Sequence, residues 1–230
     1  MSSICIIPAR AGSKRILKKN IKPFMGKPIM AYSIEAALQS SLFDVVMVST
    51  DSEEFAKVAR AYGAEVPFLR SEKTANDFAG TEDVIEEVLE KYQAMGKSFD
   101  SFCCLYSTAP FVTSARLVEG FGYLSDTVDA AISVVEYSFP IQRSVKVNDA
   151  GHLQPNFPQY MDARSQDLDK TYHDAGQFYF VKTSTFNEEK NLWCKHTAPI
   201  VLSELEVQDL DTMTDWQLAE IKFKLIHEKA

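Results

Sequence analysis

Short apolar runs alternate with amphipathic segments along most of the chain. The runs predict strands at residues 3–7, 45–49, 65–69, 101–106, 130–135, 177–181 and 199–202. Several of them are apolar on both faces, which is typical of buried parallel strands. Between the runs, apolar residues recur at three- and four-residue spacing, which predicts helices at residues 29–38, 53–62, 81–95 and 116–124.

This alternation predicts an α/β fold: a doubly wound, Rossmann-like, mostly parallel sheet with helices on both faces and a ligand at the carboxyl ends of the strands. We expect residues 1–230 to form a single domain. The pattern falters only at residues 136–171, which mix prolines, aromatic residues and an apparent hairpin around residues 148–151. We interpret this segment as an inserted arm that packs on another subunit or over the site. An ordinary surface excursion is the alternative.

Composition limits the class of protein. The 230 residues are 46% hydrophobic, which suits one large globular domain. The chain has neither the apolar leader of a signal peptide nor a run long enough for a membrane span, so we expect a soluble cytoplasmic protein. Its four cysteines lack metal-ligand spacing, which favours buried, reduced thiols.

Charge is distributed unevenly along the chain. Residues 1–34 hold seven Lys or Arg and no acid, which leaves 17 cations against all 32 acids in the remainder. A nucleic-acid-binding protein would spread its cations over a face that contacts many phosphates, and an acidic surface repels a long polyanion. A compact anion such as a nucleoside triphosphate fits this pattern better. A solvated basic patch is the alternative.

The loop at residues 8–20 concentrates this positive charge directly after a predicted strand. Its small residues Ala9, Ala11 and Gly12 would let backbone N–H groups approach phosphate oxygens, while Lys14, Arg15 and Lys19 could neutralise charge. Neither GxxxxGK[ST] nor GxGxxG follows the strand, which counts against an ATPase and a dehydrogenase.

Several motifs resemble the acylneuraminate cytidylyltransferases, the CMP-sialic acid synthetases. They are PARAGSKRI, KKN and GKP near the start, then VSTD, YGAEVP and FLR, and DLD near residue 210. They recur in the family in this order, so the resemblance covers essentially the whole chain. Two positions depart from it: Ala11 replaces a common Gly, and YSTAP at residues 106–110 replaces LQPTSP, so Tyr106 takes the place of a Gln.

Within the family, residues 137–144 and 164–180 are more similar to the pseudaminic acid cytidylyltransferases. The resemblance implies that CTP and a nine-carbon 2-keto sugar acid give the CMP-sugar and pyrophosphate, by in-line attack of the anomeric hydroxyl on the α-phosphorus. N-acetylneuraminate, legionaminate or Kdo could replace pseudaminic acid as the acceptor. A non-catalytic nucleotide-binding protein of this fold is a further alternative.

The resemblance also implies roles for single residues. Arg10 and Lys19 would hold the phosphates and serve catalysis together with Asp211, and Arg70 and Thr81 would help to place the nucleotide. The whole predicted nucleotide-binding set is Ala9, Arg10, Ala11, Gly12, Ser13, Lys19, Asn20, Arg70 and Thr81.

Asp209 and Asp211 are the candidate metal ligands. One residue separates them on a predicted extended segment, so both side chains lie on one face and can share a Mg²⁺ ion. The resemblance implies the same use. In the alternative, Asp211 or Thr212 merely caps the final helix, because TMTD at residues 212–215 is typical of a capping box.

The sugar site is expected at Arg164, Gln166, His173 and Tyr179. A guanidinium suits the sugar carboxylate, and Arg143 competes with Arg164 for this role. His173 could bind hydroxyls or be structural, and Tyr179 could be a core aromatic. The catalytic base stays open between Asp211, a metal-bound hydroxide and His173. The resemblance also implies a homodimer whose arm, residues 136–171, reaches the partner's active site.

Overall fold

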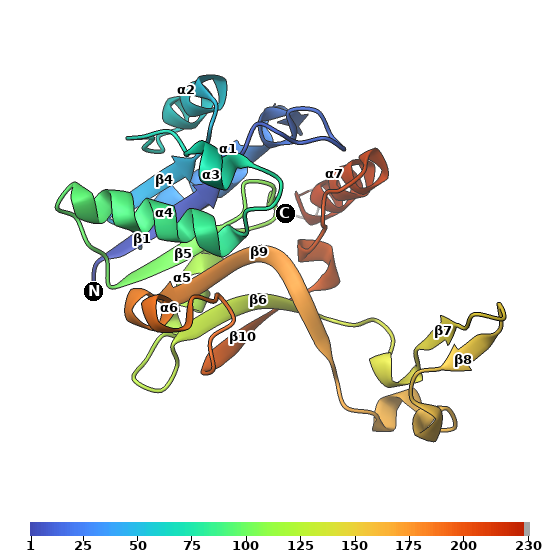
Figure 1. Cartoon of the computed structure of the whole chain (residues 1–230). Helices are drawn as coiled ribbons and strands as arrows, with labels where there is room; N and C mark the ends of the chain where they lie inside the picture. Colours follow the sequence, from blue (N-terminus) through green and yellow to red (C-terminus); the bar gives the residue numbers. More distant parts are fainter. Residues whose placement is uncertain (228–230) are drawn as a thin grey trace.

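The predicted apolar runs assemble into one central sheet of six strands (Figure 1). The computed structural model describes residues 1–227. The strands lie in the order β10–β6–β9–β5–β1–β4, and every pair is parallel except the two that β9 forms with β5 and β6. Their bounds are β1 Ser3–Pro8, β4 Val45–Ser49, β5 Ser101–Leu105, β6 Ala130–Glu136, β9 Tyr172–Lys182 and β10 Thr197–Leu202.

Helices cover both faces of the sheet, as the doubly wound pattern predicts. The helices are α1 Ile29–Ser40, α2 Glu53–Ala61, α3 Glu72–Ala75, α4 Thr81–Ala94, α5 Ser114–Gly122, α6 Thr183–Glu189 and α7 Met213–His227. Ile34, Phe55 and Leu117 bring α1, α2 and α5 against one face of the sheet. Ile85 and Phe186 bring α4 and α6 against the opposite face. None of the helices within residues 1–227 is long and apolar enough to cross a membrane.

A third, smaller cluster holds the C-terminal helix against the start of the chain. Trp216 of α7 packs edge-to-face on Phe24, with ring centroids 5.5 Å apart. Phe24 belongs to the short ribbon of β2 Pro23–Phe24 and β3 Lys27–Pro28, which follows the basic loop. This packing brings the segment before α7, with Asp209 and Asp211, to the side of the sheet where the basic loop lies.

The hairpin predicted around residues 148–151 is present. It joins β7 Val145–Val147 to β8 Leu153–Pro155, and Gly151 adopts φ +79°, which favours glycine. Figure 1 shows this hairpin set apart from the sheet, beyond the end of the long strand β9. Whether residues 136–171 form a dimerisation arm stays a prediction.

The predicted strand at residues 65–69 is wrong. Glu65 alone forms a bridge to Met47 of β4. Pro67 has no N–H to continue a ladder, so the chain leaves the sheet edge there. It returns at Arg70, whose N–H donates to the carbonyl of Thr50 at 2.8 Å. The consequence is functional, because this detour carries Arg70 to the carboxyl end of β4.

A substitution at Gly120 of α5 tests how tightly this helix packs on the sheet. A Cβ at this position would lie 2.7 Å from Ile200 Cδ1 and 2.9 Å from the ring of Phe180, both of which are fully buried. We expect Gly120→Ala to lower the free energy of unfolding by about 1–3 kcal/mol through overpacking. Urea unfolding measures this change.

Gly122→Ala is the matched control in the same helix, because nothing lies within 4 Å of its added Cβ. It should be neutral or slightly stabilising, since Ala favours helices over Gly by at most about 1 kcal/mol. Equal stability of the two variants would contradict this account of the packing.

Candidate functional site

A cavity of about 490 Å³ lies at the carboxyl ends of β1, β4 and β5. Three segments build it: the loop after β1, residues 70–81 and the turn after β5. Its lining includes six of the predicted nucleotide-binding residues: Arg10, Ser13, Lys19, Asn20, Arg70 and Thr81. A doubly wound sheet binds ligands at this edge, so the topology accounts for where these side chains meet.

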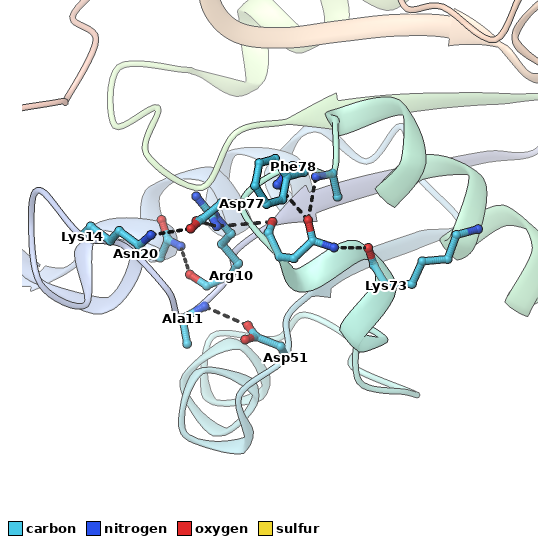
Figure 2. Close-up of polar contacts among 10 residues, drawn as sticks. Arg10, Ala11, Lys14, Asn20, Asp51, Lys73, Asp77 and Phe78 are labelled. Atoms are coloured by element: carbon cyan, nitrogen blue, oxygen red, sulfur yellow. Dashed lines mark hydrogen bonds and ion pairs between the residues drawn. The ribbon is translucent and has the colours of Figure 1, made fainter.

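The cations of the loop form ion pairs with acidic residues from other parts of the chain. Arg10 and Lys14 both contact Asp77, at 2.5 Å each (Figure 2). Arg15 contacts Asp211 at 2.7 Å, and Lys18 contacts Glu54 of α2 at 2.7 Å. Of the last two cations, only Arg15 lines the cavity. The positive charge is thus distributed between the cavity and its outer rim.

Lys19 is the most enclosed lysine of the loop. Its Nζ donates to the carbonyl of Leu210 at 2.6 Å and lies 4.0 Å from the carboxylate of Asp211. Burial lowers the pKa of Lys19, and the nearby carboxylates of Asp211 and Asp209 oppose that shift. An ammonium held in this way is stabilised when an anion enters the cavity.

The backbone access predicted at Ala9 and Ala11 is not what the structure shows. The N–H of Ala9 donates to the carbonyl of Ser49 at 2.9 Å, and that of Ala11 donates to Asp51 Oδ1 at 2.8 Å (Figure 2). These bonds fix the loop to the end of β4 and use donors that a phosphate would need. Among residues 1–227, the amides of Arg10 and Gly12 carry no such bond.

The side chain of Asn20 is also hydrogen-bonded to other parts of the protein. Its Nδ2 donates to the carbonyl of Arg10 at 2.9 Å, and its Oδ1 accepts from the hydroxyl of Ser107 at 3.0 Å. The same hydroxyl reaches the carbonyl of Pro8 at 2.9 Å. Asn20 therefore ties the turn after β5 to the loop after β1, and it positions Arg10.

Arg70 is a buried guanidinium at the floor of the cavity, with 8% of its surface exposed. Its Nε donates to Ser49 Oγ at 3.1 Å and its Nη2 to the carbonyl of Ser49 at 2.7 Å. Burial lowers the pKa of Arg70 to about 10, while Asp51 and Glu87 partly offset the effect. The guanidinium of Arg70 therefore stays charged at neutral pH and is held in place, so an anion in the cavity would balance its charge.

Thr81 begins α4 and meets a residue that sequence analysis left without a role. Its Oγ1 lies 3.1 Å from the hydroxyl of Tyr106, which also lines the cavity. The ring of Tyr106 lies 5.6 Å from that of Tyr179. The departure from the family motif at residues 106–110 was the only sign that this position is distinctive.

Tyr179 belongs to the core rather than to an open pocket. It is 2% exposed, and its hydroxyl donates to Asp174 Oδ2 at 2.6 Å. Burial raises the pKa of Tyr179, and its bond to Asp174 adds to the shift. Tyr106 lines the first cavity, and Asp174, the hydrogen-bond partner of Tyr179, lines a second one.

The second cavity has a volume of about 500 Å³ and holds His173 and Asp209. The ring of His173 lies 4.8 Å from that of Tyr137, and its Nδ1 lies 2.8 Å from the carbonyl of Asp174. The cavity is acidic: in the described part of the chain, Lys222 is the single lysine that lines it, against Glu136, Asp174, Glu204 and Asp209.

The other two predicted sugar residues lie in the projecting segment. Arg164 precedes the short 3-10 helix Ser165–Asp167, which contains Gln166. Gln166 lines a separate cavity of about 310 Å³, and Arg143 Nη1 donates to Ser165 at 3.2 Å. Within one chain, neither Arg164 nor Gln166 lines the two cavities at the sheet.

The capping question at Asp211 is resolved. Thr212 and Asp215 exchange the bonds of a capping box: the N–H and hydroxyl of Thr212 reach Asp215 Oδ2 at 2.7 and 2.8 Å. The side chain of Asp211 therefore does not cap α7, and it contacts Arg15 instead. Leu210 is buried between the more exposed Asp209 and Asp211, as expected when both carboxylates share one face.

A magnesium site here would draw on this pair. Within residues 1–227, no group of three or more His, Cys, Asp or Glu residues could hold a metal. Mg²⁺ is commonly bound by one or two carboxylates together with substrate phosphates and water. The carboxylates of Asp209 and Asp211 fit that ion, and Asp211 contacts Arg15 and Lys19, which line the first cavity.

Comparison with known proteins identifies relatives over the whole chain. A family profile described as cytidylyltransferase matches residues 4–212. The chain is 39% identical over 231 residues to the pseudaminic acid cytidylyltransferase of Campylobacter jejuni subsp. jejuni, and both are covered in full. It is 36% identical over 233 residues to the CMP-N,N'-diacetyllegionaminic acid synthase of Legionella pneumophila subsp. pneumophila, with 99% of each covered.

Solved structures of other nucleotide-using enzymes share the fold, and one of them is bound to CTP. CMP:2-keto-3-deoxy-manno-octonic acid synthetase, complexed with CTP, superposes with a TM-score of 0.69 at 18% identity. The match covers 99% of this chain and 100% of the other.

Proposed function

This chain belongs to the cytidylyltransferase family, as its motifs predict, and we propose that it activates a nine-carbon 2-keto sugar acid with CTP. Pseudaminic acid is the acceptor we favour, because a full-length relative at 39% identity carries that name. Legionaminic acid is the second candidate, on the strength of the relative at 36% identity. We place the reaction in the cytoplasm, where CTP is available.

The observation that carries this proposal is the concentration of cations in one cavity of an acidic protein. Arg10 and Lys19 of the loop after β1 meet there with the buried Arg70, which comes from a separate segment of the chain. A triphosphate is the compact anion that needs several fixed cations at once, and preorganised charge is the main catalytic contribution a protein makes to phosphoryl-type transfer.

In the proposed reaction, the anomeric hydroxyl of the sugar forms a bond to the α-phosphorus, and the bond from that phosphorus to the bridging oxygen breaks. Arg10 and Lys19 hold the phosphates and stabilise the leaving pyrophosphate, with Ser13 and Gly12 alongside. Arg70 and Thr81 orient the nucleotide. Ala9, Ala11 and Asn20 act indirectly, because their polar groups hold the loop in shape.

Asp209 and Asp211 would hold Mg²⁺, which supplies charge neutralisation on the triphosphate when bound. In the structure, Arg15 Nη1 forms an ion pair with Asp211 Oδ2 at 2.7 Å. Arg15 also lines the nucleotide cavity, so its guanidinium is placed to contact the phosphates. The base that takes the proton from the attacking hydroxyl stays open; among the side chains, Asp211 and His173 are the candidates, and His173 lines the acceptor cavity.

The acidic second cavity supports an exchanged arm. A sugar carboxylate needs a cation, yet among residues 1–227 four carboxylates and one lysine line the cavity. Arg164 and Arg143 are the guanidinium candidates, and both lie in the projecting segment. We propose a homodimer in which these residues reach the partner's acceptor cavity.

The reaction is tested by measuring pyrophosphate release from CTP, Mg²⁺ and a panel of pseudaminic, legionaminic and N-acetylneuraminic acids and Kdo. We expect turnover with CTP, and the largest kcat/KM with pseudaminic acid. The specificity follows from polar groups in the acceptor cavity that an incorrect stereoisomer leaves unpaired. Release at equal rates without any sugar would contradict the proposal.

Asp211→Asn is the matched loss-of-function variant in the same assay. It should reduce kcat by at least about a hundredfold, since it removes a metal carboxylate, and its thermal unfolding should be unchanged. Asp126→Asn, at an exposed turn, is the control and should keep full activity. Normal magnesium-dependent turnover in Asp211→Asn would contradict the metal assignment.

The dimer is tested by light scattering at micromolar concentration, where we expect twice the chain mass. The arm exposes Phe139, Val147 and Leu153, which are 82%, 68% and 73% exposed in the single chain. Leu153→Asp should yield monomers and lower activity, because a charge would be buried at the interface. Met95→Asp, at an exposed position outside the arm, should remain dimeric. A fully active wild-type monomer would contradict the exchanged arm.

A further inference from the structure

One carboxylate lies where the proposed function requires an anion. Asp77 Oδ1 contacts Arg10 Nη1 at 2.5 Å, and Asp77 Oδ2 contacts Lys14 Nζ at 2.5 Å. Figure 2 shows Asp77 between the two cations. Both cations line the phosphate cavity, so the side chain uses donors that a bound phosphate would use.

The turn that presents Asp77 is held by its neighbour. Asn76 Oδ1 accepts from the N–H groups of Phe78 and Ala79 at 2.8 and 3.0 Å, and its Nδ2 donates to the carbonyl of Lys73 at 2.6 Å (Figure 2). A side chain that caps its own turn fixes the direction of the next residue. Asp77 is therefore presented to Arg10 and Lys14 from an ordered turn at the side of the cavity.

Both ends of this turn are anchored. On one side, Glu87 of α4 accepts from the N–H of Ser71 at 2.8 Å and also contacts Thr74 and Lys91. Burial alone would raise the pKa of Glu87, but these hydrogen bonds outweigh it and lower the pKa to about 2. On the other side, the N–H of Gly80 donates to Asp83 at 2.8 Å.

The contacts of Asp77 itself are easily broken. Asp77 and Arg10 are 42% and 38% exposed, and Lys14 is 79% exposed. Exposed ion pairs are weak, because water screens the charges and both side chains lose freedom. A triphosphate carries several charges and can displace one carboxylate.

We propose that Asp77 is an internal competitor for the triphosphate site, a residue that sets the affinity for CTP and for the pyrophosphate product. The inference rests on the proposed function, which makes the cavity a triphosphate site. Asp77 offsets part of the charge of Arg10 and Lys14 in the empty enzyme, leaves them when the nucleotide binds, and returns as pyrophosphate departs. It thereby weakens ground-state binding of both anions.

Titration calorimetry of Asp77→Asn with inorganic pyrophosphate and with CTP tests this inference. The variant should bind both anions about three- to tenfold more tightly than wild type, which is the range expected from the loss of two exposed ion pairs. The gain should shrink as salt is raised, because screening weakens exposed pairs. Asp77→Ala should show the same direction, since it also lacks the carboxylate.

Glu54→Gln is the matched control. Glu54 pairs with Lys18 of the same loop at 2.7 Å, and neither residue lines the cavity. Glu54→Gln removes one negative charge beside the same loop, as Asp77→Asn does, and it should leave the affinities for pyrophosphate and CTP unchanged. Equal tightening in Glu54→Gln would overturn the inference, because a general change in charge would then explain the effect.

Weaker or unchanged binding of the two anions to Asp77→Asn would also overturn the inference. Weaker binding would make Asp77 a residue that orders Arg10. The outcomes separate this inference from the proposed function. Tighter pyrophosphate binding in the variant, with no binding of CTP by either protein, would support the competitor and contradict the nucleotide. No binding of either anion to either protein would overturn both.

Discussion

The site is organised by the need to balance a cluster of cations in an acidic chain. Five Lys and Arg residues lie within ten positions after the first strand, and like charges so close together destabilise the loop unless each finds a partner. The partners come from distant segments: Asp77, Glu54 and Asp211. Charge pairing therefore links the loop to the turn before α4 and to the segment before α7 at the cavity, and to α2 outside it.

Burial of a few polar groups makes this arrangement rigid. Arg70 is fixed on Ser49, and Asn20 links the turns after β1 and β5. The exposed pairs can exchange partners, whereas these buried bonds cannot be given up without leaving unpaired polar groups. The resulting cavity has a fixed floor and a rim of replaceable contacts, which suits a ligand that must enter and a product that must leave.

Periodicity and motifs predict most of the fold and much of the nucleotide cavity. Strands that are apolar on both faces have few alternatives, and parallel order places the basic loop beside the turn after β5. Arg10, Lys19, Arg70 and Thr81 meet as expected. The failures have physical causes: Pro67 ends a strand early, and the amides of Ala9 and Ala11 hydrogen-bond to the end of β4 instead of remaining free.

The acceptor side was harder to predict because it depends on contacts far apart in sequence. Sequence alone leaves Tyr179 open between a pocket residue and a core aromatic; pairing of β9 with β5 and β6 buries it, and its hydroxyl donates to Asp174. No local pattern reveals that Asp77 would meet Arg10 across 67 residues. Arg164 lies in a segment whose place in an assembly one chain does not determine.

The central claim is that the basic loop and Arg70 form a triphosphate site. Titration calorimetry with CTP, CDP, CMP and cytidine in the presence of Mg²⁺ tests it most directly. Each fixed cation acts only on a phosphate, so the affinity should fall at each step and by at least about a hundredfold from CTP to cytidine. Cytidine binding as tightly as CTP, or a polynucleotide binding more tightly than either, would contradict the account.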